Sequence, residues 1–402
     1  MGGSDHSRRA FLERLGLWGA GTLFLPSPAR AVAEAAYLAE LQKTAPPARF
    51  WAPAASPSLS CTSCHEKVPA GKAERGHRRR PVKCLLCAHG CVIEEGERGR
   101  CRARANVRGE LRSLVYGRPV ALHVDPIEKK PFYHFLPGSQ AFSLGTAGCP
   151  LSCRFCQNWE ISQASPEDLP ADYLPPSALV ERARQVGTPV IAFTYNEPTV
   201  FAEYLLDTAR EAGQRGLRAV LVSCGFMQEA PLREMMEVLG AIKVDLKGFS
   251  PEFYRKVSRA ELDPVLRTIR TVARAGRHLE IVNLVVPTLN DDPALLDGLC
   301  RWVAGEIGPD VPLHFTRFHP DYQLLNLPPT PVATLERARE AALKHGLRYP
   351  YIGNVPGHPG NHTYCPSCGK VVIERQGFFV TANHLQAGTC PFCGKPVKGV
   401  WS

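Results

Sequence analysis

Three closely spaced cysteines carry the clearest chemical signal in the sequence. Cys149, Cys153 and Cys156 have the spacing C-x3-C-x2-C, which chance seldom gives at this cysteine content. A cubane iron–sulfur cluster normally takes four thiolates, so three would leave one iron open. The pattern therefore predicts a [4Fe–4S] cluster with a free coordination position. The alternative is a zinc site completed by a distant ligand, which fits less well because the loop follows a barrel strand.

An open iron can bind the amino and carboxylate groups of S-adenosylmethionine (SAM). The reduced cluster then passes one electron to the sulfonium, the C–S bond breaks, and a 5′-deoxyadenosyl radical forms that abstracts hydrogen from a substrate. The cofactor performs this chemistry, while the protein positions it and excludes water. The residues do not identify the substrate.

Two sets of four cysteines flank the central loop. The C-terminal set forms two Cys-Pro-x-Cys-Gly knuckles: Cys365, Cys368, Cys390 and Cys393. It predicts a closed, structural zinc ribbon, with a second iron–sulfur cluster as the alternative. The N-terminal set has the spacing C-x2-C-x3-C-x9-C: Cys84, Cys87, Cys91 and Cys101. It predicts a small metal site that holds either zinc or an iron–sulfur cluster.

The motif Cys61-Thr-Ser-Cys64-His65 allows two interpretations. C-x-x-C-H is the attachment motif of covalent haem, and Cys61 and Cys64 also have zinc-ribbon spacing with Cys84 and Cys87. Haem attachment requires an unfolded chain outside the cytoplasm, whereas twin-arginine export moves folded proteins. We therefore favour zinc over haem at this motif.

The first residues have the order of a targeting signal. Arg8 and Arg9 form a twin-arginine pattern, an apolar stretch follows at 15–25, and Ala29-Arg30-Ala31 fits a small-residue cleavage site. This predicts export to the periplasm or cell envelope; the alternative is the cytoplasm, where SAM is made. The apolar stretch is much shorter than the ~20 residues of a membrane span, and no other transmembrane candidate appears.

Apolar strand-like runs alternate with helix-like stretches from residue 141 onward. The predicted strands are Ala141–Gly145, Val190–Tyr195, Ala219–Ser223, Ile242–Leu246, Leu279–Val286 and Leu313–Phe318. The predicted helices are 178–185, 200–214, 231–239, 264–275, 295–306 and 334–345. Buried parallel strands joined by helices indicate an α/β fold, and about six repeats fit an open, partial (βα)6 TIM-like barrel. Catalytic groups would then lie at the carboxyl ends of the strands.

The composition is that of a globular protein with a sizeable core, since 44% of residues are hydrophobic and 21% charged. The net charge of +10 includes the run 78–80, which we interpret as a solvated basic loop and not as a nucleic-acid-binding surface.

The expected segments are a twin-arginine-type signal (1–31), a linker with the C-x-x-C-H motif (32–80), a cysteine-rich metal module (81–116), a connector (117–140), the core barrel (141–360) and the zinc ribbon (361–402).

The cysteine loop also resembles a known family. The spacing is that of radical SAM enzymes, and Phe155 occupies the aromatic position before the third cysteine. The segments 148–163, 125–138 (Asp-Pro-Ile-Glu-Lys-Lys-Pro-Phe-Tyr-His-Phe-Leu-Pro-Gly) and 193–199 (Phe-Thr-Tyr-Asn-Glu-Pro-Thr) look like the radical SAM member of the AmmeMemoRadiSam system. These enzymes are similar to the pyruvate formate-lyase activating enzymes. The resemblance covers about 81–402.

The resemblance implies SAM contacts at four residues. Glu197 would meet the SAM amino group, although the two glycines that precede this acid in relatives are absent here. Asp245 and Lys247 match an Asp-x-Lys pattern near SAM, with a salt bridge at the barrel mouth as the alternative. His319 matches a histidine near the ribose. AMMECR-type and Memo-type proteins are the partners that the resemblance implies, together with an external electron donor.

The targeting signal and the chemistry disagree, because SAM is made in the cytoplasm. Two hypotheses follow. The first is a SAM-cleaving enzyme that acts on a protein or a small molecule. The second is an exported iron–sulfur protein for electron transfer or binding that has lost SAM turnover. The presence of all four implied SAM contacts favours the first.

Overall fold

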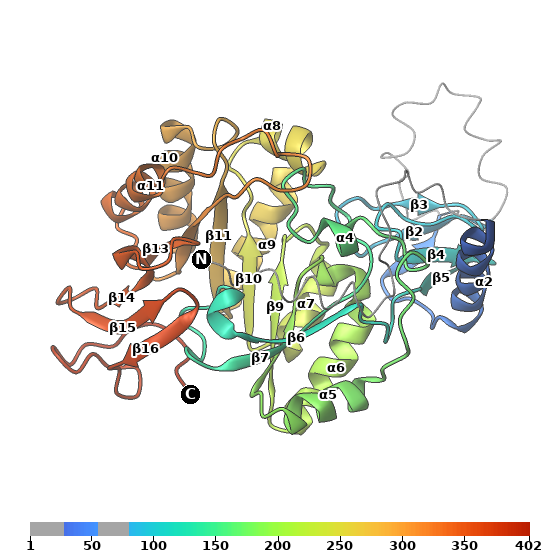
Figure 1. Ribbon diagram of the computed structural model, residues 1–402, viewed down its shortest axis with the longest axis horizontal. Coiled ribbons are helices and arrows are strands. Elements are labelled where there is room, and N and C mark those ends of the chain that lie inside the picture. The colour runs from blue at the N-terminus through green and yellow to red at the C-terminus, as the bar shows by residue number, and fades with distance from the viewer. Residues whose placement is uncertain (1–27, 55–79) are drawn as a thin grey trace.

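The computed structural model describes residues 28–54 and 80–402, and its centre is an eight-stranded sheet (Figure 1). The strand order is β13-β12-β11-β10-β9-β8-β7-β6, and every neighbouring pair from β7 to β13 is parallel. All six predicted strands are present: β7 (Gln140–Gly145), β8 (Val190–Phe193), β9 (Arg218–Ser223), β10 (Ala241–Asp245), β11 (His278–Val285) and β12 (Leu313–Arg317). The predicted α/β fold with a mostly parallel sheet is therefore confirmed.

Two strands of the central sheet were missing from the prediction. β13 (Pro350–Gly353) adds a seventh parallel strand beside β12, so the expectation of six strands was too low. β6 (Ala121–Pro126) lies in the segment interpreted as a connector and pairs antiparallel with β7. β13 has only four residues and contains Pro350 and Gly353, which weaken any strand signal. The sheet is open, because β6 and β13 form its two edges.

The helices between the strands cover the outer face of the sheet. They are α5 (Pro176–Gln185), α6 (Ala202–Gln214), α7 (Glu229–Val238), α9 (Leu262–Arg274), α10 (Pro293–Trp302) and α11 (Val332–Lys344), with shorter α4 (Trp159–Ser162) and α8 (Pro251–Phe253). α10 shows how the sequence sets a helix start: Asp292 accepts the amide hydrogens of Ala294 and Leu295, and Pro293 occupies the first helical position. Because side chains pack on both faces, all four residues of β8 are buried.

A small N-terminal module lies beyond one side of the sheet, at the right of Figure 1. It consists of α2 (Pro28–Thr44), the antiparallel sheet β1 (Trp51–Pro53), β2 (Val82–Cys84) and β3 (Val92–Ile93), and the hairpin β4 (Arg104–Val107) and β5 (Glu110–Ser113). Arg104 and Glu203 form a buried ion pair at 2.8 Å, which fixes the hairpin to α6. Removing one partner of such a pair would leave a buried charge, so the module is tied closely to the barrel.

A C-terminal antiparallel sheet lies at the opposite side, at the left of Figure 1. Its strands are β14 (Thr363–Tyr364), β15 (Val371–Gln376) and β16 (Phe379–Asn383). Arg375 is buried, donates to the carbonyl oxygen of Tyr133 at 2.8 Å, and lies over the ring of the same tyrosine with 4.1 Å to the centroid. The sheet is thus fastened to the segment between β6 and β7.

None of the helices in the described ranges is both long and apolar enough to cross a membrane. The predicted targeting signal lies almost entirely outside the described residues, as does the Cys61-Cys64-His65 motif.

Candidate functional site

A cavity of about 440 Å³ opens where the parallel strands end. Polar side chains from consecutive strand ends line it, including Glu197 after β8, Cys224 after β9, and Asp245 and Lys247 at β10. The volume lies within the range of about 300–1,000 Å³ that is typical of small-molecule sites. The carboxyl ends of a parallel sheet are where such sites form, and the cavity lies where the sequence predicts the catalytic groups.

The central cysteines form part of the cavity wall: Cys149, Cys153 and Cys156. Their loop begins at Gly148, whose φ of +93° favours glycine and whose Cβ position lies only 2.3 Å from the carbonyl oxygen of Cys101. Asn196 donates to the carbonyl oxygen of Gly148 at 2.7 Å and accepts from the amide of Thr146. A side chain at the end of β8 therefore holds the start of the cysteine loop.

The spacing and burial of these sulfurs fit an iron–sulfur cluster better than a single ion. Within the described part of the chain, only the C-terminal cysteines form a group whose ligand atoms all lie within 4.8 Å, so the central sulfurs are spread more widely. Burial raises the pKa of Cys153 to about 11, and the nearby Lys247 opposes this rise. Cysteines bind metal as thiolates, and a raised pKa makes the thiolate costly to form. A bound metal centre, which is positively charged, would offset that cost.

Glu197 is buried and lies beside Cys149, whose thiol pKa is raised by burial and by the Glu197 carboxylate. The Glu197 carboxylate accepts from the amide of Cys224 at 2.6 Å, from the hydroxyl of Ser223 at 2.8 Å and from the amide of Thr199 at 3.1 Å. It therefore joins the ends of β8 and β9 at the cavity wall. The predicted acid is in the cavity, and part of its hydrogen-bonding capacity is used by the protein.

Asp245 lies between two lysines at the end of β10. It accepts a hydrogen bond from Lys243, and its second oxygen lies 3.7 Å from the ammonium of Lys247. Burial would raise the pKa of Asp245, but the two ammonium groups outweigh it and lower the pKa. Lys247 also lies over the ring of Phe155, 5.7 Å from the centroid. The salt bridge foreseen as an alternative is present, and both of its predicted members line the cavity.

His319 is the predicted residue that the structure places elsewhere. Its side chain is exposed, hydrogen bonds the carbonyl oxygen of Pro320, and is not among the described residues that line the cavity. The cavity instead contains His314 of β12, which is buried and bonded to Glu280 at 2.8 Å. β12 ends at Arg317, two residues before His319.

Sequence reasoning missed a second charged group in the cavity. Lys130 and Tyr195 line the wall, and both hydrogen bond the Asp125 carboxylate at 2.6 Å. Burial would raise the pKa of Asp125, but Lys130, Lys129 and Tyr195 outweigh it and hold that pKa well below its usual value. Burial lowers the pKa of Lys130 to about 8, although Asp125 opposes this. The acidic and basic side chains of segment 125–138 were the feature of the sequence that could have indicated this charged group.

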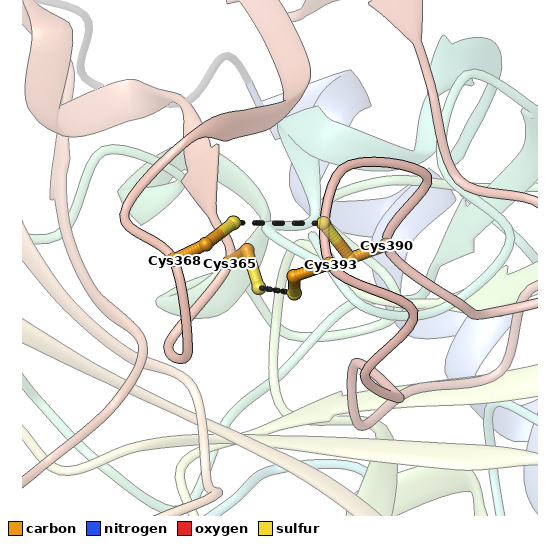
Figure 2. Close-up of side chains that lie close together, drawn as sticks. All are labelled: Cys365, Cys368, Cys390 and Cys393. Atoms are coloured by element: carbon orange, nitrogen blue, oxygen red, sulfur yellow. Dashed lines mark hydrogen bonds between the residues drawn. The ribbon is translucent and has the colours of Figure 1, made fainter.

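The C-terminal cysteines converge as the zinc-ribbon pattern predicts (Figure 2). The Cys365 sulfur lies 3.6 Å from that of Cys393, and the Cys368 sulfur lies 3.8 Å from that of Cys390. Tetrahedral zinc with Zn–S bonds of about 2.3 Å would set neighbouring sulfurs about 3.8 Å apart. The set therefore has the dimensions of a zinc tetrathiolate. Phe378, from the turn between β15 and β16, reaches the wall of the cavity.

The N-terminal cysteines also come together, around a separate small cavity: Cys84, Cys87, Cys91 and Cys101. The structure thus gathers each predicted set of metal ligands that falls within the described residues. Cys61 and Cys64, the remaining predicted ligands, lie outside them.

Residues 143–297 match the family model described as the radical SAM superfamily. An uncharacterized protein of Methanocaldococcus jannaschii is 43% identical over 318 residues, which cover 79% of this chain and 95% of the relative.

Two solved structures are also similar to this chain. A domain of pyruvate-formate lyase-activating enzyme from Bacteroides vulgatus is 18% identical, covers 40% of this chain and 98% of its own, and has a TM-score of 0.37. A radical SAM methyltransferase from Sphaerobacter thermophilus is 16% identical, covers 59% of this chain and 71% of its own, and has a TM-score of 0.42.

Proposed function

This chain belongs to the radical SAM superfamily, and we propose that it cleaves SAM reductively and uses the resulting 5′-deoxyadenosyl radical to abstract hydrogen from a substrate. The observation that carries the proposal is the group of three cysteines at the wall of the strand-end cavity. Cys149, Cys153 and Cys156 would hold a [4Fe–4S] cluster, and their number leaves one iron without a protein thiolate. When bound, this cluster supplies the electron that breaks the bond between the SAM sulfur and C5′.

The residues around the cysteines are suited to hold SAM. Glu197 lies beside Cys149 and would accept a hydrogen bond from the SAM amino group. Asp245, which is held by two lysines, stays ionised and offers a further acceptor in the same cavity. Leu151 and Phe155 add apolar surface to the wall, which excludes water from a reactive intermediate.

The substrate would bind in the same cavity, because the radical must reach it before water does. The wall away from the strand ends is built by the segment 128–133 and by Phe378. It includes the ammonium of Lys130 and the carboxyl of Glu128, so the substrate would be polar. Partners of the AMMECR and Memo type, an external electron donor and twin-arginine export stay predictions from the sequence.

Release of 5′-deoxyadenosine tests this proposal. Anaerobically reconstituted protein with SAM and dithionite should form 5′-deoxyadenosine and methionine, and Cys153→Ala should form neither. Cys300→Ser is the matched control, since Cys300 is buried against the carbonyl oxygen of Ala338, away from the cavity. A wild-type protein with an intact cluster and no product would refute SAM cleavage and favour an electron-transfer or binding role.

A further inference from the structure

We propose that Cys84, Cys87, Cys91 and Cys101 hold a second [4Fe–4S] cluster and not zinc. This site is separate from the cluster loop and does not depend on SAM cleavage. All four side chains line one cavity in the N-terminal module, together with Arg104. Cys84 and Cys101 are buried, and Cys87 and Cys91 are partly buried.

The distances between sulfurs distinguish this site from the zinc ribbon of the same chain. The ribbon sulfurs form pairs at 3.6 and 3.8 Å and all lie within 4.8 Å of one another. In the described residues, no three of the four N-terminal sulfurs meet that 4.8 Å limit. One zinc ion must draw all its thiolates together, whereas in a cubane each thiolate binds a different iron at a different corner. The N-terminal sulfurs are therefore not drawn together as one zinc ion would require.

The cysteine spacing points the same way. The first three N-terminal cysteines are spaced C-x2-C-x3-C. These are the two gaps of the central C-x3-C-x2-C loop in reverse order. The two Cys-Pro-x-Cys-Gly knuckles of the ribbon have no counterpart in residues 84–101. Cys101 supplies a fourth thiolate, which closes the cubane. The second cluster would therefore have no open iron and could not bind SAM as the first does.

An unpaired donor in the cavity wall supports an anionic occupant. Arg104 is 1% exposed, and its terminal nitrogens donate to Glu203. Its Nε–H has no hydrogen-bond partner among the described residues. A buried donor without an acceptor is costly, and the thiolates and inorganic sulfides of a cluster are acceptors that would satisfy it.

The second site adjoins the cluster loop. The carbonyl oxygen of Cys101 lies against Gly148, the residue before Cys149. His89 hydrogen bonds the carbonyl oxygen of Pro150 at 2.9 Å, and Cys87 forms a β-bridge with Met227 after β9. The module therefore places its metal site directly behind the loop that carries the three central cysteines.

Metal analysis of the full-length chain tests the assignment without using enzyme activity. The background variant Cys149→Ala/Cys153→Ala/Cys156→Ala lacks the ligands of the first cluster. After anaerobic reconstitution it should retain about four iron and four sulfide per chain, with a Mössbauer spectrum of a [4Fe–4S] cluster. Adding Cys87→Ser and Cys91→Ser should remove that iron, whereas adding Cys300→Ser should not. Far-ultraviolet circular dichroism and thermal unfolding report in each case that the chain is folded.

A background variant that holds no iron, or that holds a second zinc in its place, overturns the proposal. Loss of iron on adding Cys61→Ser and Cys64→Ser would also overturn it, because the ligand set would then be different. None of these outcomes depends on whether the wild-type protein cleaves SAM.

Discussion

Charged side chains of opposite sign lie in or directly behind the cavity wall, and each affects its neighbours. Lys243, Asp245 and Lys247 form one group, and Lys130 with Asp125 forms another. Burial alone would neutralise such groups, and the opposite charge beside each one keeps it ionised. Burial would lower the pKa of Lys247, for example, but Asp245 and the nearby thiols hold it well above its ordinary value. Lys247 therefore supplies a permanent positive charge beside the cysteine loop.

Removing the Lys247 charge should make the first cluster harder to reduce. Reduction adds a negative charge, which a nearby ammonium stabilises, so Lys247→Gln should lower the midpoint potential by on the order of tens of millivolts. A redox titration followed by electron paramagnetic resonance measures this. Lys247→Arg, which keeps the charge, should stay close to wild type. An unchanged potential in Lys247→Gln would show that the lysine does not act on the cluster.

Glu128 predicts a dependence of stability on pH. Burial raises the pKa of Glu128 to about 6, although Arg375 opposes this. The folded-state pKa lies above the unfolded value of 4.5, so the folded protein favours the protonated carboxyl group of Glu128. The stability that this protonated group contributes is complete below pH 4.5 and is lost as the pH rises through about 6. Glu128→Gln stays neutral, so its free energy of unfolding should exceed that of wild type by up to about 2 kcal/mol at pH 8.

The advantage of Glu128→Gln should shrink as the pH falls from 7 to 5. Denaturant unfolding of both proteins across this range measures the difference. A variant that is less stable than wild type at pH 8 would show that the ionised Glu128 carboxylate stabilises the fold.

At the scale of elements, the ends of neighbouring strands bring the site together. β7 leads into the cysteine loop, β8 ends before Asn196 and Glu197, and β10 ends at Asp245. The loop after β7 needs a glycine because its first turn passes against Cys101 of the N-terminal module. The position of the cysteine loop at the strand ends therefore depends on a contact between Gly148 and Cys101, which are far apart in the chain.

Gly148→Ala should disrupt that contact. A methyl group would lie 2.3 Å from the Cys101 carbonyl oxygen at a φ that disfavours alanine, so the loop must shift. We expect the variant to lose most of the iron of its first cluster after reconstitution. Iron and sulfide analysis measures this. Gly213→Ala is the control, because nothing lies within 4 Å of its Cβ position. Full iron content in Gly148→Ala would contradict the account of this loop.

The sequence predicted elements well where they repeat and poorly where they do not. Six strands and six helices followed from alternating apolar runs. β13 was missed because it is short, and β6 because five of its six residues are only partly buried or exposed at a sheet edge. Glu197, Asp245 and Lys247 could be placed because each lies at or just after the end of a recognisable strand. His319 lies outside the cavity wall, and Lys130 was missed, because neither position follows from the end of a predicted strand.

At the scale of the whole molecule, the barrel is flanked by two cysteine-bearing modules that both reach the site. The N-terminal module contacts the cluster loop through Cys101 and His89. The C-terminal module contributes Phe378 to the cavity wall and packs Arg375 over the ring of Tyr133. Each module thus affects the cavity without belonging to the barrel.

If the C-terminal cysteines hold zinc as the sequence predicts, removing their thiolates should weaken the cavity wall. Cys365→Ser/Cys368→Ser should lose one zinc per chain and unfold at a lower temperature, because the knuckle loops lose their common ligand. Substrate-dependent turnover should fall more than the iron content, since Phe378 is displaced and the cysteine loop is not. Elemental analysis and thermal unfolding measure these effects. A variant with unchanged zinc would show that these cysteines do not hold it.

The most direct test of the central claim is whether SAM binds the iron that the three cysteines leave open. Reduced wild-type protein with SAM labelled with ¹⁵N at its amino group should show a hyperfine coupling between the nitrogen and the cluster in electron–nuclear double resonance. A cluster that shows no coupling at saturating SAM, with its fourth iron bound to a protein side chain, would contradict the account.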